Sequence, residues 1–508
     1  MRSPVTNAAR HASPYDQRII FGRKPPTFPP PETDLPDQSV TPRPTSLALL
    51  AVICGLAGCH TQAPDTSSEL TLETPLAWTA AETSDQDPVP ATDWIESFDD
   101  PALTEIVAEA IEANYDLAAT AARLSAAQAS AVISGADRYP QLSVGADGSQ
   151  RELRSSGSGV DDRLRTESYS LALDLSWEID IWGRLNDRAR AGEADYEAVQ
   201  ADYAAARLSL SAITARSWFN AVEAELQVRL AEDIYQSFQN NLETIENRFR
   251  TGLSRALDLR LTRANVAGAA SNLEFRLRRR DEAIRSLETI LGRYPDASQV
   301  ASTHLPRPPA TVPAGLPADL ISRRPDLIAS ERRLAAADAR YREAKKAMLP
   351  SIRLTGSAGT TSAELGNLVN GDFSFWNLAG GITQPLFQGR RLQAGAERSK
   401  ADREAVLAAY ASSALQAFRE VETTLAAENT LRREETALKW AEEESMAAED
   451  LAWEEYEAGL SDIITVLESQ RRSFLAQRDL LSTRNLRLQN RINLHLALGG
   501  SFSATPQN

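Results

Sequence analysis

Residues 249–254 read Phe-Arg-Thr-Gly-Leu-Ser, and residues 456–461 read Tyr-Glu-Ala-Gly-Leu-Ser. Gly459 therefore lies 207 positions after Gly252, and a Leu-Gly pair ending at 499 follows one ending at 292 by the same offset. A constant offset between similar segments indicates an internal repeat. Each copy is predicted to contain a strand pair, a long helix, a glycine turn and a second long helix.

The strongest strand signal lies at residues 169–181, where apolar residues alternate with polar ones that include Asp174, Glu178 and Asp180. A period of two with acids on one face is typical of a strand with lipid on one side and water on the other. We predict two hairpins with polar loops at 148–165 and 359–374. Their strands cover about 141–150, 168–181, 351–359 and 375–387.

A single strand of this kind also fits a soluble hairpin. A sheet inside a bilayer, however, must close on itself, because each unpaired backbone group at an edge costs several kcal/mol. Four strands are too few, since the smallest membrane barrels have about eight. The chain is therefore expected to oligomerise, and three copies would supply about twelve strands.

The segments between the strand pairs predict unusually long helices. No proline occurs between Arg184 and Arg248, and apolar residues there step by three and four, as in a coiled coil. At 1.5 Å per residue, about 60 residues reach roughly 90 Å. The predicted helices cover about 184–248, 253–291, 390–456 and 461–498. A soluble coiled-coil tether would explain these helices but not the strands.

The N-terminal region predicts an export signal. The apolar run at 46–55 is too short to span a bilayer but fits the apolar core of a signal peptide. It is followed by Leu56-Ala57-Gly58-Cys59, which resembles the bacterial lipobox. We therefore expect cleavage before Cys59 and a covalent lipid on it; the alternative is a chance cysteine after an apolar run. The predicted domains are 1–58 (leader and lipoprotein signal peptide), 59–100 (lipidated extended segment), 101–292 (first copy), 293–316 (linker), 317–500 (second copy) and 501–508 (tail).

Composition argues against several functions. The 508-residue chain has a formal net charge of −16, which disfavours binding to nucleic acid. Its four histidines lack metal-ligand spacing, and two cysteines cannot build a zinc site. An envelope hydrolase would need a convergent acid, base or nucleophile, and no such set is recognisable. We expect no enzymatic activity, no metal and no cofactor apart from the lipid on Cys59.

Three further segments carry a family resemblance. Residues 321–337 contain Arg324-Pro325-Asp326 and look like the Arg-Pro-Asp signature of TolC-like outer-membrane factors, the NodT/OprM-type efflux lipoproteins. Residues 177–185 and 384–390 resemble the strand-to-helix junctions of that family. With the lipobox and both glycine turns, the resemblance covers about residues 56–500.

The resemblance implies a mostly α fold with transmembrane β structure. Each chain would give a duplicated long-helix coiled coil to a periplasmic α-barrel and four strands to a trimeric twelve-stranded β-barrel in the cell outer membrane. The homotrimer would be the passive exit duct of a tripartite efflux pump. Its partners would be a periplasmic adaptor protein and an inner-membrane transporter of the resistance-nodulation-division type. An exit channel for type I secretion and a structural envelope lipoprotein are the alternatives.

The resemblance also assigns site residues. The periplasmic turns would dock the adaptor through Thr251, Gly252, Leu253, Ala458, Gly459 and Leu460. The aperture residues would be Asp258, Tyr456, Ile464 and Glu468, with Tyr456 as the hydrogen-bonding partner of Asp258.

Ile464 and Glu468 are one helical turn apart and share a face. If that face points inward, three chains would stack an apolar ring on a carboxylate ring. Ser461 and Thr465 stand where the family pattern has an arginine and an acid. The sequence therefore does not decide whether a salt bridge locks the helices together here. Each assignment has an alternative. The two glycines would then only cap their helices, and Asp258 and Glu468 would be ordinary solvated side chains on helices.

Overall fold

The computed structural model describes residues 78–80, 94–157, 160–299, 302, 304–308 and 323–500. Cys59, the signal-peptide segment and the tail at 501–508 lie outside the described residues, and so does much of the linker. All elements below belong to one compact unit, Leu70–Asn508. Among the described helices, none contains a stretch that is both long and apolar enough to cross a membrane.

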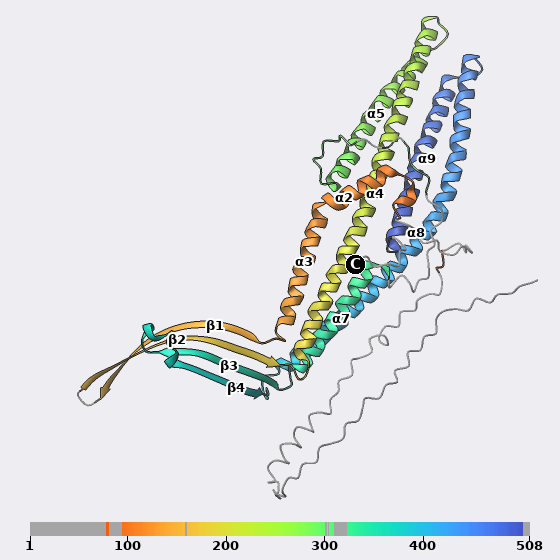
Figure 1. Ribbon diagram of the computed structural model, residues 1–508. Coiled ribbons are helices and arrows are strands. Elements are labelled where there is room, and N and C mark those ends of the chain that lie inside the picture. The colour runs from red at the N-terminus through yellow and green to blue at the C-terminus, as the bar shows by residue number, and fades with distance from the viewer. Residues whose placement is uncertain are drawn as a thin grey trace, which may run out of the picture. The chain divides into compact units, whose positions relative to one another are not determined.

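The four strands form one antiparallel sheet in chain order (Figure 1). The strands are β1 (Gln141–Gly157), β2 (Val160–Ile179), β3 (Ser351–Ser362) and β4 (Ser374–Thr383). β1 and β4 are the two edge strands, and each pairs on one side only within the described chain. The sheet therefore ends in two unpaired backbone edges.

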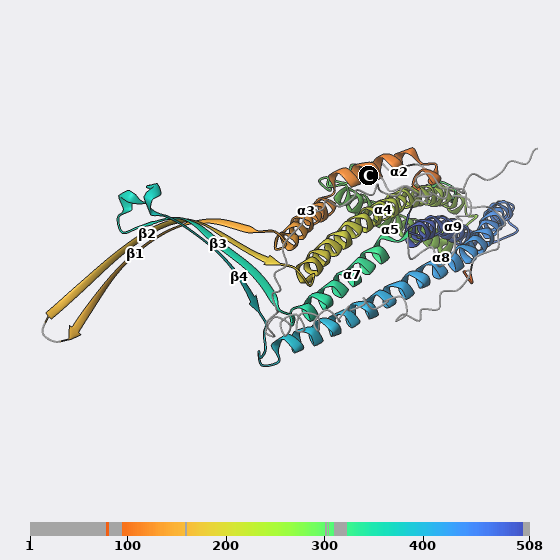
Figure 2. The same ribbon diagram turned by 60° about the horizontal axis from the view of Figure 1, so that its bottom comes forward.

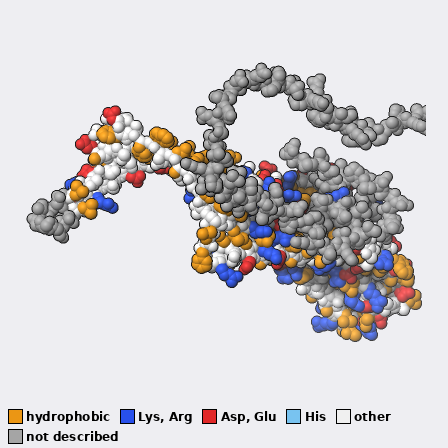
Figure 3. All heavy atoms as spheres, turned by 90° about the horizontal axis from the view of Figure 1, so that it is seen from below, with side chains coloured by type: hydrophobic (Ala, Val, Ile, Leu, Met, Phe, Trp, Pro, Cys, Tyr) orange, Lys and Arg blue, Asp and Glu red, His pale blue; other side chains and the backbone are white. Residues whose placement is uncertain are grey.

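The strand register gathers apolar side chains on one face of the sheet. The pairs on that face include Leu142–Leu175, Val144–Leu173, Trp177–Leu354, Ile352–Ile382 and Gly356–Leu378. The opposite face carries polar pairs such as Ser143–Asp174 and Glu178–Arg353. Large apolar side chains of the first face are uncovered, with Trp376 79% exposed, and apolar atoms are visible on the strands in Figure 3. The predicted alternation is therefore present across the sheet.

The predicted hairpin loops are too long, and the loop at 148–165 is wrong. β1 and β2 stay paired from Gly148–Tyr169 out to Gly157–Val160, because backbone hydrogen bonds do not require apolar side chains. In the second hairpin, β3 continues to Ser362, and two short 3-10 helices precede β4: η3 (Leu365–Asn367) and η4 (Gly371–Phe373). β4 ends at Thr383, short of the predicted 387, because Pro385 has no N–H to donate to a ladder.

The helices repeat the internal duplication residue for residue. The matched pairs are α4 (Arg184–Arg250) with α8 (Arg391–Glu457), α5 (Ala256–Ile290) with α9 (Ile463–Ala497), and α3 (Tyr115–Ala136) with α7 (Pro325–Lys346). α4 and α8 have 67 residues each, and α5 and α9 have 35 each. α5 and α9 begin at 256 and 463, three and two residues after the predicted starts, because the turns use the residues between. Four further elements were not predicted from the sequence: α3, α7, α2 (Pro101–Ala113) and η2 (Glu96–Phe98).

Two helix orders follow from the contacts between helices. Beside the sheet, α3, α4, α7 and α8 pack in that order, as Figure 2 shows. At the ends of α4 and α8 that are remote from the sheet, the order is different (Figure 1). There α5 packs on α4, α4 packs on α9, and α9 packs on α8. α5 and α8 are therefore the outer helices of the second set, and each has one face without a helical neighbour in the chain.

In each copy a polar side chain from the residue before α3 or α7 donates a hydrogen bond to the carbonyl of the last residue of α5 or α9. The Asn114 side chain donates to the Ile290 carbonyl at 2.9 Å, and Arg324 donates to the Ala497 carbonyl at 3.1 Å. Arg324 also donates to the carboxylates of Asp326 and Glu420, at 2.7 and 2.8 Å. The Arg-Pro-Asp motif is thus a clamp: its proline opens α7 at a position that needs no N–H, and its arginine ties α7 to α8 and α9.

Candidate functional site

Both inter-helix turns have the same backbone geometry. Gly252 and Gly459 adopt left-handed φ values of 77° and 76°, which disfavour any other residue. Leu253 N–H donates to the Arg248 carbonyl at 2.8 Å, and Leu460 N–H donates to the Glu455 carbonyl at 2.8 Å. These are Schellman caps, which use the glycine to satisfy the last carbonyls of α4 and α8.

The six predicted docking residues all lie at the surface of these turns. Leu253 is 72% exposed and Leu460 is 80% exposed, and the residues beside them are exposed as well. A leucine at the apex of a tight turn has no local partner to cover it. The capping role of the glycines is therefore visible in the structure, and the docking role of the turns stays a prediction.

Asp258 and Tyr456 are buried, but they do not bind each other. Asp258 caps α5: it accepts hydrogen bonds from the Arg255 backbone N–H at 2.9 Å and from the Arg255 guanidinium at 3.1 Å. The Tyr456 hydroxyl instead pairs with Ser254 Oγ at 3.1 Å, and the Arg248 guanidinium lies 4.8 Å from its ring centre. The Asp258–Tyr456 hydrogen bond that the resemblance implies is not formed within the chain, because the Asp258 carboxylate is engaged by Arg255 in capping α5.

Ile464 and Glu468 do share a face, as predicted. Both line a groove of about 460 Å³ between α8 and α9, together with Asp462. Glu468 forms ion pairs with Arg471 at 2.8 Å and Arg472 at 2.9 Å, both on its own helix. Hydrogen bonds from these two arginines lower the pKa of Glu468 to about 2. Both arginines lie one turn beyond Glu468 on α9 itself, so these ion pairs do not lock α9 to another helix.

Three partners of Asp258 and Tyr456 were not predicted from the sequence: Arg248, Ser254 and Arg255. Ser254 belongs to the repeated Gly-Leu-Ser motif, so the repeat itself was a usable signal for it. Arg248 and Arg255 carried no signal, because a lone arginine on a long helix is usually solvated.

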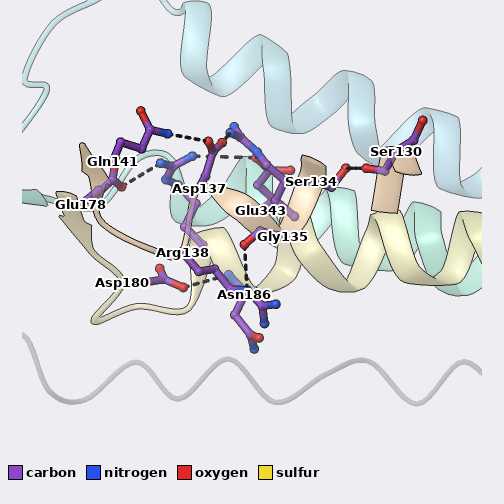
Figure 4. Close-up of polar contacts among 12 residues, drawn as sticks. Ser130, Ser134, Gly135, Asp137, Arg138, Gln141, Glu178, Asp180, Asn186 and Glu343 are labelled. Carbon is purple, nitrogen blue, oxygen red and sulfur yellow. Dashed lines mark hydrogen bonds and ion pairs between the residues drawn. The ribbon is translucent and has the colours of Figure 1, made fainter. Parts of the chain in front are cut away.

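The strand-to-helix junction is a network of ion pairs (Figure 4). Arg184, the first residue of α4, pairs with Glu178 of β2 at 2.7 Å. Arg188, one turn later, pairs at 2.7 Å with Glu343 of α7 and at 2.7 Å with Asp137. These contacts fix the direction in which α4 leaves the sheet and hold α3 and α7 against it.

Two side chains repeat this junction in both copies. Trp177 donates its indole N–H to the Arg138 carbonyl at 2.9 Å. At the matching position of the second copy, Gln384 donates to the Met348 carbonyl at 3.1 Å. Each sheet hairpin is thereby tied to the end of the helix that precedes it, α3 or α7.

Known proteins share this arrangement. Residues 106–293 and 316–500 match the family described as outer membrane efflux protein. The pyoverdine export outer membrane protein OpmQ of Pseudomonas putida is 31% identical over 471 residues, covering 91% of this chain and 98% of OpmQ. The toluene efflux pump outer membrane protein TtgF of Pseudomonas putida is 32% identical over 409 residues, covering 80% of this chain and 85% of TtgF. The solved structure of the outer-membrane channel OprN is similar with a TM-score of 0.80 at 25% identity, covering 88% of this chain and 99% of that one.

A sheet with an exposed apolar face, continued by two duplicated helical hairpins, defines a TolC-like outer-membrane channel protein. The chain belongs to the outer membrane efflux protein family, and it is an outer-membrane channel of efflux systems. The resemblance based on the Arg-Pro-Asp motif is thus confirmed, together with the fold class and the location in the outer membrane.

Proposed function

We propose that three copies of this chain form a passive exit duct through the outer membrane, with their long helices extending into the periplasm. The observation that carries this proposal is the four-stranded sheet with one apolar face and two unpaired edges. In a bilayer each edge must find a partner, and β1 of one copy can pair with β4 of the next. Three copies give about twelve strands, enough to enclose a lumen.

The duct is proposed to work with two partners. The exposed turns around Gly252 and Gly459 would receive a periplasmic adaptor, which connects the duct to an inner-membrane transporter of the resistance-nodulation-division type. The transporter supplies the energy, so the duct itself needs no catalysis. A lipid on Cys59 would anchor the N-terminus in the same membrane; the Leu-Ala-Gly-Cys sequence supports this.

Membership of the family does not determine which substrate the duct carries. One relative is named for pyoverdine export and another for toluene efflux, although they are 31% and 32% identical to this chain. A shared duct therefore serves different substrates. Selection of the substrate is proposed to lie in the transporter rather than in this chain.

The groove at Ile464 and Glu468 is proposed to lie at the aperture of the duct. Glu468→Gln would leave Arg471 and Arg472 without their carboxylate, so the local charge becomes more positive. We expect the single-channel current of the purified protein in a planar lipid bilayer to shift towards anion selectivity, with weaker block by divalent cations. Because the pKa of Glu468 is about 2, the parent channel should keep its selectivity from about pH 7 down to about pH 4.

Two variants control this experiment. Glu105→Gln removes an exposed glutamate from α2 and should leave selectivity unchanged. Asp258→Asn tests the second aperture acid; because Asp258 caps α5, the folded fraction is measured in parallel. If neither Glu468→Gln nor Asp258→Asn alters current or divalent block, these residues do not line the aperture.

A further inference from the structure

A groove lies along α4 where α5 and α9 flank it. All three helices line the groove, which has a volume of about 290 Å³, and we call it the α4 groove. α5 and α9 each pack on α4 but touch each other only slightly, which leaves the space between them open. Its apolar surface comes from Leu230, Ile234 and Phe238 of α4 and from Leu467, Phe474 and Leu475 of α9. A concave apolar groove of this size suits a small molecule.

The charged side chains in the lining of the α4 groove are all positive. The lining contains Arg276, Arg471 and Arg478 and no aspartate or glutamate, although acids outnumber lysines and arginines by 70 to 54 in the whole chain. Two of the arginines pair with acids outside the lining. Arg471 pairs with Glu468 at 2.8 Å, and Arg478 pairs with Asp479 at 2.8 Å. Arg276 is therefore the arginine whose charge is left uncompensated.

The surroundings of Arg276 favour an added anion. Its guanidinium donates to the side-chain oxygen of Asn272 at 3.4 Å and forms no ion pair with any residue that the structure describes. Glu223 acts on this charge from a distance, while its carboxylate accepts a hydrogen bond from Ser482 at 2.9 Å. Burial, followed by the charge of Arg478, lowers the pKa of Arg276. An anion beside two such guanidinium groups would gain charge-assisted hydrogen bonds.

The uncompensated charge lies at one end of the groove. α4 runs towards the turns, whereas α5 and α9 run away from them, so Arg276 and Arg478 lie at the end remote from the turns. From Arg276 to Asn265, at the other end of the lining, α5 rises about 16 Å. Towards the turns, the rings of Phe238 and Phe474 meet edge to face, with their centres 5.7 Å apart. The groove thus has a cationic end and an apolar end.

Gly268 opens the wall that α5 gives to the groove. A glycine inside a helix is destabilising relative to alanine. Close packing does not require it here, because no atom lies within 4 Å of the place that a Cβ would take. The matching position of the second copy is Leu475, whose side chain lines the same groove. Gly268 therefore leaves room where the repeat has a leucine.

We propose that the α4 groove binds an amphipathic organic anion, with its acidic head at Arg276 and its apolar body along Phe238 and Phe474. The anion gives Arg276 the partner that it lacks, and the two rings cover the apolar body. The volume equals that of about ten water molecules, which suits a ligand of modest size. A bound ligand joins α5 to α9. This site goes beyond the exit duct and does not depend on how many chains assemble.

Uptake of radiolabelled decanoate by the full chain in lipid nanodiscs tests the site. Equilibrium dialysis beside empty nanodiscs subtracts the decanoate that dissolves in lipid. We expect saturable uptake of one decanoate per chain. Decanol and decyltrimethylammonium, which have the same chain length without the negative charge, should show no saturable uptake.

Two arginine variants test the head of the site. Arg276→Gln should weaken decanoate binding at least about tenfold, because a charge-assisted hydrogen bond is lost. Arg260→Gln removes an exposed arginine of the same helix that does not line the groove, and it should leave binding unchanged. Equal weakening by both variants would show that the overall charge of α5, and not Arg276, attracts the anion.

A series at Gly268 tests the body of the site. Gly268→Leu should abolish saturable binding because it fills the groove, while the melting temperature stays at or above that of the parent, since leucine is the better helix former. Gly268→Ala is the matched smaller change and should keep the affinity within about threefold, because a Cβ meets no atom there. Equal binding by the parent and Gly268→Leu, equal uptake of all three probes, or no saturable uptake by the parent would overturn the proposal. Dye release from vesicles reports on the duct separately.

Discussion

Arg324→Ala is expected to lower the free energy of unfolding by about 2 kcal/mol, the order of cost for losing hydrogen bonds to charged groups and leaving a buried carbonyl unpaired. Arg324 has a side chain only 10% exposed, and it holds Asp326, Glu420 and the Ala497 carbonyl. Its loss leaves the carbonyl unpaired, whereas both carboxylates are partly exposed and regain water. The measurement is chemical denaturation of the purified protein in detergent, followed by far-UV circular dichroism.

The duplication supplies the control for this variant. Asn114→Ala removes the matching contact to Ile290 in the first copy and also an N-cap hydrogen bond to Leu117 N–H. It should cost about 1 kcal/mol, because no charge is involved. Arg324→Lys should recover little, since an ammonium group cannot reach three acceptors in a fork. If Arg324→Ala costs no more than Asn114→Ala, the motif is not a clamp.

His495 is expected to make the protein labile to acid. The ring is 2% exposed and stacks on Trp94 at 5.4 Å, and neither ring nitrogen has a hydrogen-bond partner among the described residues. Burial, followed by the charge of Arg491, lowers its pKa to about 4. The unfolded chain takes up this proton near pH 6.5 and the folded chain near 4, so stability falls as pH drops through that window. The loss by about pH 4 is about 3 kcal/mol.

His495→Leu should remove this pH dependence, because leucine fills a similar space without titrating. Denaturation midpoints of the parent and the variant, measured between about pH 7 and about pH 4, give the comparison. The parent should weaken across this range more than the variant does. Parallel curves for the two proteins would show that His495 is not the group responsible.

The sequence predicted the duplicated architecture well, because its signals are local. The alternation at 169–181 and the offset between Gly252 and Gly459 each follow from backbone periodicity and turn chemistry. The length of β1 and β2 was missed, because their outer halves are held by main-chain pairing, which leaves no hydrophobic pattern. α3 and α7 were missed for a related reason: their alanine-rich packing faces give only weak amphipathic signals.

The site was predicted in outline only. Ile464 and Glu468 share a face because helical spacing decides it. The partner of Tyr456 depends on which side chain binds the Asp258 carboxylate. Arg255 binds it because Arg255 lies three residues before Asp258, within the same helical turn. The role of the Arg-Pro-Asp motif likewise needed coordinates, since Glu420 and Ala497 lie 96 and 173 residues from Arg324.

The number of copies that enclose one pore tests the central claim most directly. Light scattering of the purified protein in detergent, corrected for bound detergent, gives the mass of the protein part, and the same sample is then reconstituted into lipid vesicles loaded with a fluorescent dye. The account predicts a protein mass of three chains and release of the dye. A particle containing a single chain that leaves the vesicles sealed would contradict it.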